Sequence, residues 1–149
     1  MSETFIIDEW FWADLNGENG VEKQRETSEF IDLLFKRCDR IVVARDSEFQ
    51  QKEWEFSKKA IDVTKRGIAR LYFGKIKFNS QKYEDVDIRN IREADLEDID
   101  SDDIYLVKTC CKVNAPIITT DNSLINALKS KDISCSHRDE FLRGYFKNA

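Results

Sequence analysis

Four acidic side chains occupy positions from which a folded chain could bring them together for metal chemistry. Asp8 and Asp121 each follow a short apolar run typical of a buried strand, and Asp103 opens an apolar segment typical of a buried helix. Glu53 lies on the apolar side of the helix expected after the second strand. Crowded carboxylates are costly out of water unless a cation accompanies them, and Mg²⁺ prefers oxygen ligands. The pattern therefore predicts a site for Mg²⁺ or Mn²⁺ formed by these four acids.

Each acid also has a purely structural interpretation. Asp8, Asp103 and Asp121 stand at expected helix starts, where Asp is a favoured N-cap residue. Only their joint order along the chain favours the metal site. Neighbouring acids remain open as alternatives, namely Glu48 in place of Glu53, and Glu9 and Asp102 beside the first and third positions.

The elements that must position these acids alternate between strand and helix. Apolar runs and alternating patterns predict strands at 5–7, 41–44, 86–91, 117–120 and 133–135, with 86–91 at an edge of the sheet. Helical spacing predicts helices from an Asn19 cap to Cys38, after Asp46 or Ser47, over 65–78 and 104–113, after Asp121, and around 141–145. The cluster Trp10-Phe11-Trp12 is interpreted as core and dimer contact. This alternation predicts a single three-layer α/β/α domain over residues 1–149 with a mainly parallel sheet.

The composition suits one folded domain and excludes several kinds of site. The chain has 149 residues, of which 41% are hydrophobic and 36% charged, enough for a real core under a charged surface. The single histidine, His137, excludes a multi-histidine zinc site and is interpreted as a surface or cap residue. The four cysteines lack CxxC spacing and are expected to be small buried apolar groups. The apolar run 5–7 is too short for a signal peptide or membrane span, which predicts a cytoplasmic protein.

The charges are unevenly distributed, although the formal net charge is −5. Eight basic residues and three acids occur from Lys52 to Lys77, a stretch called the basic arm below, whereas ten acids and two arginines occur from Glu84 to Asp103. Because Lys and Arg dominate affinity for phosphate backbones, the basic arm predicts a face that guides RNA, with Tyr72 or Phe73 stacking on an unpaired base. The alternative is an ordinary solvated helix face. The residues expected to bind RNA are Lys58, Lys59, Lys65, Arg66 and Arg70.

Four segments resemble the blocks of a PIN domain and occur in the same order. They are FIID, IVVARDSEFQQKEW, DDIYLVKTCCKVNAPIITTDNSLINAL and ISCSHRDEFLRGYF. In that family an acid follows the first strand, a second lies on a central helix, a third opens a buried helix and a fourth follows a Thr-x-Asp turn. These positions match Asp8, Glu53, Asp103 and Asp121.

The resemblance implies a PIN-like fold and Mg²⁺- or Mn²⁺-dependent hydrolysis of phosphodiester bonds in single-stranded RNA. Its similarity to VapC-type toxins implies an antitoxin partner and a homodimer. A catalytically silent PIN-like module that binds RNA or protein would share the same pattern. A receiver-type phosphorylation domain also carries an acidic pair after its first strand, but it needs a lysine just after the last strand, where this chain has Ser136-His137-Arg138.

Overall fold

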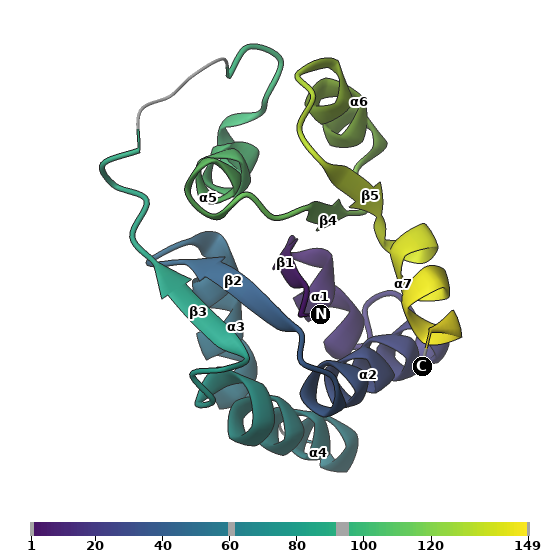
Figure 1. Ribbon diagram of the computed structural model, residues 1–149. Helices are drawn as coiled ribbons and strands as arrows, with labels where there is room; N and C mark the ends of the chain where they lie inside the picture. Colours follow the sequence, from purple (N-terminus) through teal and green to yellow (C-terminus); the bar gives the residue numbers. More distant parts are fainter. Residues whose placement is uncertain (1, 60–61, 92–95, 149) are drawn as a thin grey trace.

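The computed structural model describes residues 2–59, 62–91 and 96–148. Short strands alternate with helices along the chain (Figure 1). The elements are β1 (Thr4–Ile7), α1 (Trp10–Leu15), α2 (Val21–Lys36), β2 (Arg40–Ala44), α3 (Glu48–Lys59), α4 (Val63–Tyr72), the π-helix η1 (Phe73–Lys77), β3 (Tyr83–Val86), the 3₁₀ turn η2 (Ser101–Asp103), α5 (Ile104–Val113), β4 (Ile117–Thr119), α6 (Asn122–Ser130), β5 (Cys135–His137) and α7 (Arg138–Lys147).

The five strands form one parallel sheet in the order β3-β2-β1-β4-β5. The chain builds outward from β1 to β3 on one side and then returns to add β4 and β5 on the other. Strand order therefore reverses between β1 and β4, and open parallel sheets bind ligands at the carboxyl end of such a switch point. Receiver domains have the flavodoxin-like order 2-1-3-4-5. The receiver-type alternative is therefore wrong.

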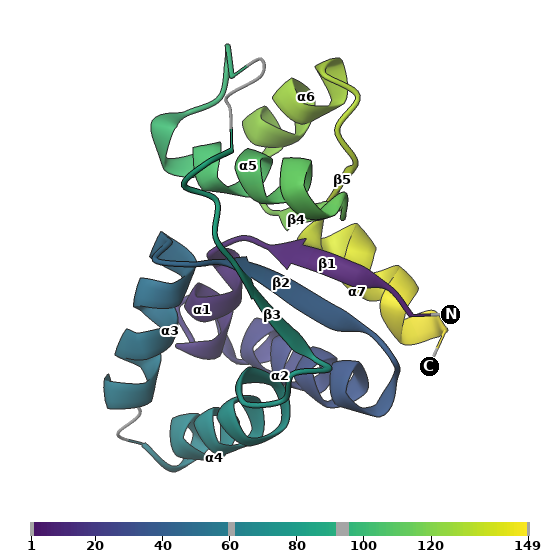
Figure 2. The same cartoon turned by 60° about the vertical axis from the view of Figure 1, so that its left-hand side comes forward.

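Helices cover both faces of the sheet. Because side chains alternate along a strand, Phe5 and Ile7 of β1 pack into a large cluster with α1, α2, α3, α4 and α7. Ile6 points the other way, into a smaller cluster with Leu106 of α5 and Leu124 of α6. Figure 2 shows α5 and α6 on one side of the sheet and α1 to α4 on the other. The predicted three-layer α/β/α fold is confirmed.

Local sequence explains several element boundaries. Ser47 precedes α3, and its hydroxyl and carbonyl accept hydrogen bonds from Gln50 N and Gln51 N at 3.4 and 3.0 Å, so the predicted Ser47 cap is confirmed. Helix α5 ends at Val113 and is capped by Asn114, which has a left-handed φ of 55°, and Pro116 follows shortly before β4. The predicted helix within 65–78 is confirmed as α4 continued by η1.

Other predicted boundaries are wrong for reasons of tertiary pairing. The edge strand lies at 83–86 rather than 86–91, because β2 offers partners only from Ile41 to Ala44. The last strand lies at 135–137 rather than 133–135, because it pairs with the three residues of β4. Gly20, not Asn19, caps α2 with a φ of 100°, and the Asn19 amide donates to Asp14 instead.

Buried aromatic side chains were predicted more accurately than cysteines. Trp10, Phe11 and Trp12 all lie in the core, on the short helix α1, which the sequence did not reveal as a helix. The four cysteines are free, but they are not the buried groups that were predicted. Cys38 and Cys111 are exposed, while Cys110 and Cys135 are half-buried.

Candidate functional site

Asp8 lies at the switch point, immediately after β1, and its carboxylate is held in place. Thr119 at the end of β4 donates its hydroxyl to Asp8 Oδ2 at 2.7 Å. The backbone N–H of Glu9 donates to Asp8 Oδ1 at 2.6 Å. The two neighbouring strands thus fix one carboxylate at the carboxyl edge of the sheet.

Asp121 and Asp103 approach this edge from two further elements. Asp121 caps α6, and its Oδ1 accepts from Ser123 N at 2.9 Å and from Leu124 N at 3.2 Å. Asp103 stands at the start of α5 without a side-chain capping bond. The cap interpretation is therefore confirmed for Asp121, whereas Asp103 occupies the N-cap position of α5 without a capping bond from its side chain.

The three aspartates act on one another electrostatically. Burial raises the pKa of Asp8, and the charge of Asp121 raises it further against the lowering by the Thr119 and Glu9 hydrogen bonds. Burial raises the pKa of Asp103 to about 6, and the charges of Asp8 and Asp121 add to that rise. The structure thus brings Asp8, Asp103 and Asp121 into one acidic group.

A second acid pair adjoins this group. Burial and the neighbouring carboxylate of Glu48 raise the pKa of Glu9 to about 7. Lys52 Nζ lies 3.5 Å from Glu9 Oε2 and opposes this rise. Glu9 Oε1 is buried with no hydrogen-bond partner within the described chain. Glu9 and Glu48, which the sequence analysis kept as alternative site residues, therefore lie beside Asp8. Together with the three aspartates they make five acids, which are called the acidic edge below: Asp8, Glu9, Glu48, Asp103 and Asp121.

Glu53 does not join the acidic edge. Its carboxylate is buried and accepts from the hydroxyls of Tyr72 at 2.6 Å and Tyr83 at 3.2 Å. Lys77 Nζ lies 2.9 Å from Glu53 Oε1. Both oxygens are thus engaged by α4, η1 and β3, so the sequence interpretation of Glu53 as the helix acid of the site gives way to Glu48.

Tyr105 is a site residue that sequence reasoning missed. Its hydroxyl is buried and has no hydrogen-bond partner among the described residues. Burial raises its pKa, and the charges of Asp8 and Glu9 raise it further. The only sequence signal was a tyrosine in the first turn of the helix that Asp103 opens.

The donor set suits a hard divalent cation. Carboxylate oxygens are the ligands that Mg²⁺ and Mn²⁺ take in proteins, and the unpartnered Glu9 Oε1 and Tyr105 hydroxyl leave polar atoms unsatisfied here. Within the parts of the chain that the structure describes, no three acids, histidines or cysteines are yet close enough to hold one ion. The side chains have the chemistry that a divalent cation requires, and binding of the cation would have to draw them closer together.

The residues predicted to bind RNA divide between two helices. Lys58 and Lys59 lie in the last turn of α3, whereas Lys65, Arg66 and Arg70 lie on α4. Lys59 and Lys65 join Lys52 around a pocket of about 390 Å³ that α1, α3 and α4 line. The hydroxyl and ring of Tyr72 are buried, so the prediction that Tyr72 stacks on a base is wrong.

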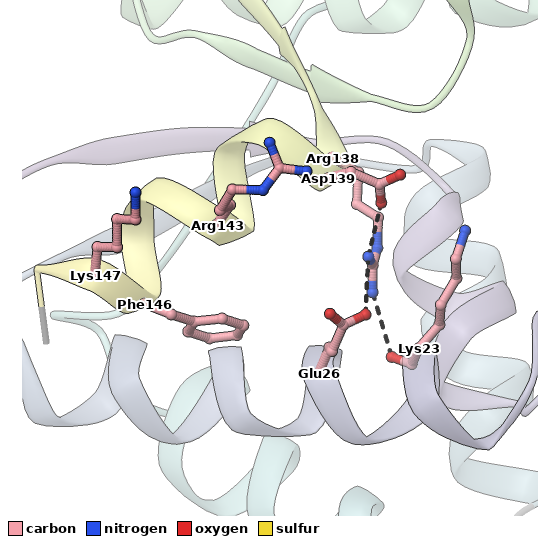
Figure 3. A pocket seen from close by; sticks show the side chains of 7 residues that line it. All are labelled: Lys23, Glu26, Arg138, Asp139, Arg143, Phe146 and Lys147. Carbon is pink, nitrogen blue, oxygen red and sulfur yellow. Dashed lines mark hydrogen bonds and ion pairs between the residues drawn. The ribbon is translucent and has the colours of Figure 1, made fainter.

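A separate pocket of about 580 Å³ lies between α2 and α7 (Figure 3). Arg138 crosses it and is almost fully buried, with Nε 2.8 Å from Asp14 Oδ2 and Nη1 3.2 Å from Glu26 Oε1. Asp139 also pairs with it at 2.9 Å. Because these carboxylates compensate the guanidinium charge, we assign Arg138 to the packing of α7.

The parallel sheet and the helices on its two faces define a three-layer α/β/α domain, consistent with a PIN-like fold. A chain in the crystal structure of VapBC2 from Rickettsia felis bound to a DNA fragment from their promoter has a similar fold, with a TM-score of 0.52 and 13% sequence identity. The match covers 90% of this chain and 98% of that chain. No family model matches the sequence, and no curated protein matches it significantly.

In the described part of the chain, no helix has the length and apolar character needed to cross a bilayer.

Proposed function

We propose that this protein is a Mg²⁺- or Mn²⁺-dependent ribonuclease of the PIN type that hydrolyses single-stranded RNA. The observation that carries the proposal is the gathering of Asp8, Asp103 and Asp121 at the switch point of the sheet, where the charge of Asp121 adds to the burial that raises the pKa of both Asp8 and Asp103. Such repulsion destabilises the ion-free fold, and a bound cation relieves it. The similarity in fold to a chain of VapBC2 supports the same class.

The chain's own groups would divide the work. Asp8, oriented by Thr119, would be a ligand together with Asp103 and Asp121, and Glu48 with Glu9 would complete or position the shell. The Tyr105 hydroxyl has no acceptor among the residues that the structure describes and can donate to a phosphate oxygen. When bound, the cation polarises the scissile phosphate and lowers the pKa of the attacking water.

The proposal extends to partners. The similar chain comes from a VapBC2 structure, so we include an antitoxin-type protein that covers the acidic edge. A homodimer and a cytoplasmic location belong to the same proposal. A catalytically silent module with this fold would bind RNA or protein without metal-dependent turnover.

The test is the substitution Asp8→Asn, which is nearly isosteric and removes one negative charge. Without metal, the variant should melt at the same temperature as the parent or higher, because repulsion within the acidic edge is reduced. With Mn²⁺ at a hundredfold excess over Kd, the parent should gain about 2.7 kcal/mol of stability and the variant should lose most of that gain. Thermal melts with and without Mn²⁺ measure both effects.

An RNA-cleavage assay on the same two proteins completes the test. Cleavage of single-stranded RNA by Asp8→Asn should fall to background. Glu29→Gln is the matched control, because it removes an exposed negative charge from α2. A parent that melts identically with and without Mn²⁺ and cuts no RNA would leave the silent module as the correct function.

A further inference from the structure

Two large aromatic side chains are exposed on one side of the molecule. Trp54 on α3 is 58% exposed, and Phe78, just after η1, is 78% exposed. Both line the same pocket of about 430 Å³, together with Phe73, whose ring centroid lies 6.1 Å from that of Phe78. Neighbouring exposed aromatics of this size are typical of binding surfaces.

The wall of this pocket carries no uncompensated charge. Glu53 lines it, but Lys77 lies 2.9 Å from Glu53 Oε1 and neutralises it. The ammonium of Lys58 instead lies over the exposed indole, with Nζ 3.8 Å from the centroid of the Trp54 ring. The pocket therefore offers aromatic faces inside and positive charge at its rim.

Trp54 of the pocket and Glu48 of the acidic edge lie on the same helix, α3. A second hollow, lined by Asp46, Ser47 and Gln51, shares Gln50 and Trp54 with the first. It starts where α3 begins, at the end of the helix that carries Glu48. At 1.5 Å per residue, Trp54 lies roughly 9 Å further along the helix axis, so one extended strand could span both places.

On the basis of the proposed ribonuclease function, we propose that this α3–η1 groove is a base-stacking subsite for single-stranded RNA, with Trp54 and Phe78 stacking on unpaired bases. Proteins that bind single strands combine aromatic platforms with basic residues along the backbone path. A groove with exposed rings, compensated walls and a lysine at its rim matches that chemistry. It replaces the buried Tyr72 predicted from sequence as the stacking residue.

Tryptophan fluorescence tests the subsite directly. Trp10 and Trp12 are only 5% and 1% exposed, so quenching by an added oligouridine reports on Trp54. With EDTA present to prevent cleavage, the single strand should quench the emission, and a duplex RNA should not. Trp54→Ala should abolish quenching and weaken binding roughly tenfold, whereas Trp54→Phe should keep most of the affinity. Phe78→Ala should weaken binding similarly.

A matched control removes an exposed apolar side chain elsewhere. Val21 on α2 is 79% exposed, and Val21→Ala should leave affinity and quenching unchanged. If the parent cuts RNA but Trp54→Ala binds it as tightly, the subsite is wrong and the nuclease stands. If Trp54→Ala instead turns a dimer into a monomer with unchanged RNA affinity, the groove joins two copies and the proposal is overturned. Absent cleavage with intact quenching refutes the nuclease alone.

Discussion

Glu48 and Glu53 lie on the same helix but belong to different parts of the molecule. Glu48 starts α3 and raises the pKa of Glu9 at the acidic edge. Glu53 is more than a turn further along, where its carboxylate faces Tyr72 and Lys77 in the core. A shift along one helix thus separates a carboxylate at the acidic edge from one that pairs with core residues.

The two glutamates should respond differently to the same substitution. Glu53→Gln leaves Lys77 without its charge partner, and breaking a buried pair costs on the order of 3 kcal/mol. Mn²⁺ affinity should stay unchanged in that variant. Glu48→Gln should weaken Mn²⁺ binding with little loss of ion-free stability. Urea unfolding and a Mn²⁺ titration of both variants would contradict the assignment if their effects were interchanged.

Asp103 should make the ion-free protein less stable as the pH rises. Its pKa is about 6 when folded, against an ordinary value of 3.8, so between these values the folded state binds more protons than the unfolded state. The free energy of unfolding must therefore fall as pH rises through this window. Asp103→Asn should remove that part of the slope. Urea unfolding in EDTA from pH 4 to 7 measures it, and a parallel slope in parent and variant would refute the prediction.

At the scale of elements, one buried arginine ties the last helix to the first two. Arg138 starts α7, and its guanidinium contacts Asp14 of α1, the hydroxyl of Thr27 on α2 at 3.2 Å, and Glu26. Asp14 and Arg138 are 1% and 2% exposed. Because α7 directly follows β5, this anchor also fixes the edge of the sheet next to β4.

Removing one member of this buried pair should be more damaging than removing both. Asp14→Leu leaves Arg138 buried without its main partner and should cost about 3–5 kcal/mol. The double variant Asp14→Leu, Arg138→Met should recover much of that loss, because neither charge remains to be desolvated. A double-mutant cycle by urea unfolding measures the coupling. Additive effects would show that the pair contributes nothing beyond its separate contacts.

At the scale of the whole molecule, basic and acidic residues are concentrated in different stretches of the chain. The net charge of −5 includes the acidic edge, yet the basic arm supplies Lys52, Lys59 and Lys65 to one pocket beside α1. Lys52 also lies next to Glu9, so this pocket adjoins the acidic edge. Part of the acidic stretch, residues 92–95, lies outside the described residues.

The basic arm should control RNA affinity without affecting metal binding. Replacing Lys58, Lys59, Lys65 and Arg66 with Ser should weaken binding of single-stranded RNA, and each lost phosphate contact should reduce the slope of log K against log salt by about 0.7. The Mn²⁺-dependent gain in melting temperature should persist. Binding measured over a range of salt concentrations provides the slope, and an unchanged slope would make the arm an ordinary solvated surface.

The sequence alone determined the fold class and, of the four acids predicted for the site, the three that lie at the carboxyl edge. The apolar runs before Asp8 and before Asp121 each predict a strand followed by a turn, because buried strands and the turns after them have distinct residue preferences. Because the strands are parallel, the turns that follow them lie at the same edge of the sheet. For this reason the fold class and the positions of these acids could be predicted from sequence. The electrostatic effect of Asp8 and Asp121 on the neighbouring acids agrees with those positions.

Only the tertiary structure decided which helix acid faces the edge and which aromatic side chains remain exposed. Glu48 and Glu53 have similar helical surroundings in sequence, but the positions of Tyr72, Tyr83 and Lys77 draw Glu53 inward. Strand limits likewise followed from the partner strand, as at β3 and β5. Local periodicity shows that a side chain faces an interior, but contacts distant in sequence determine what it meets there.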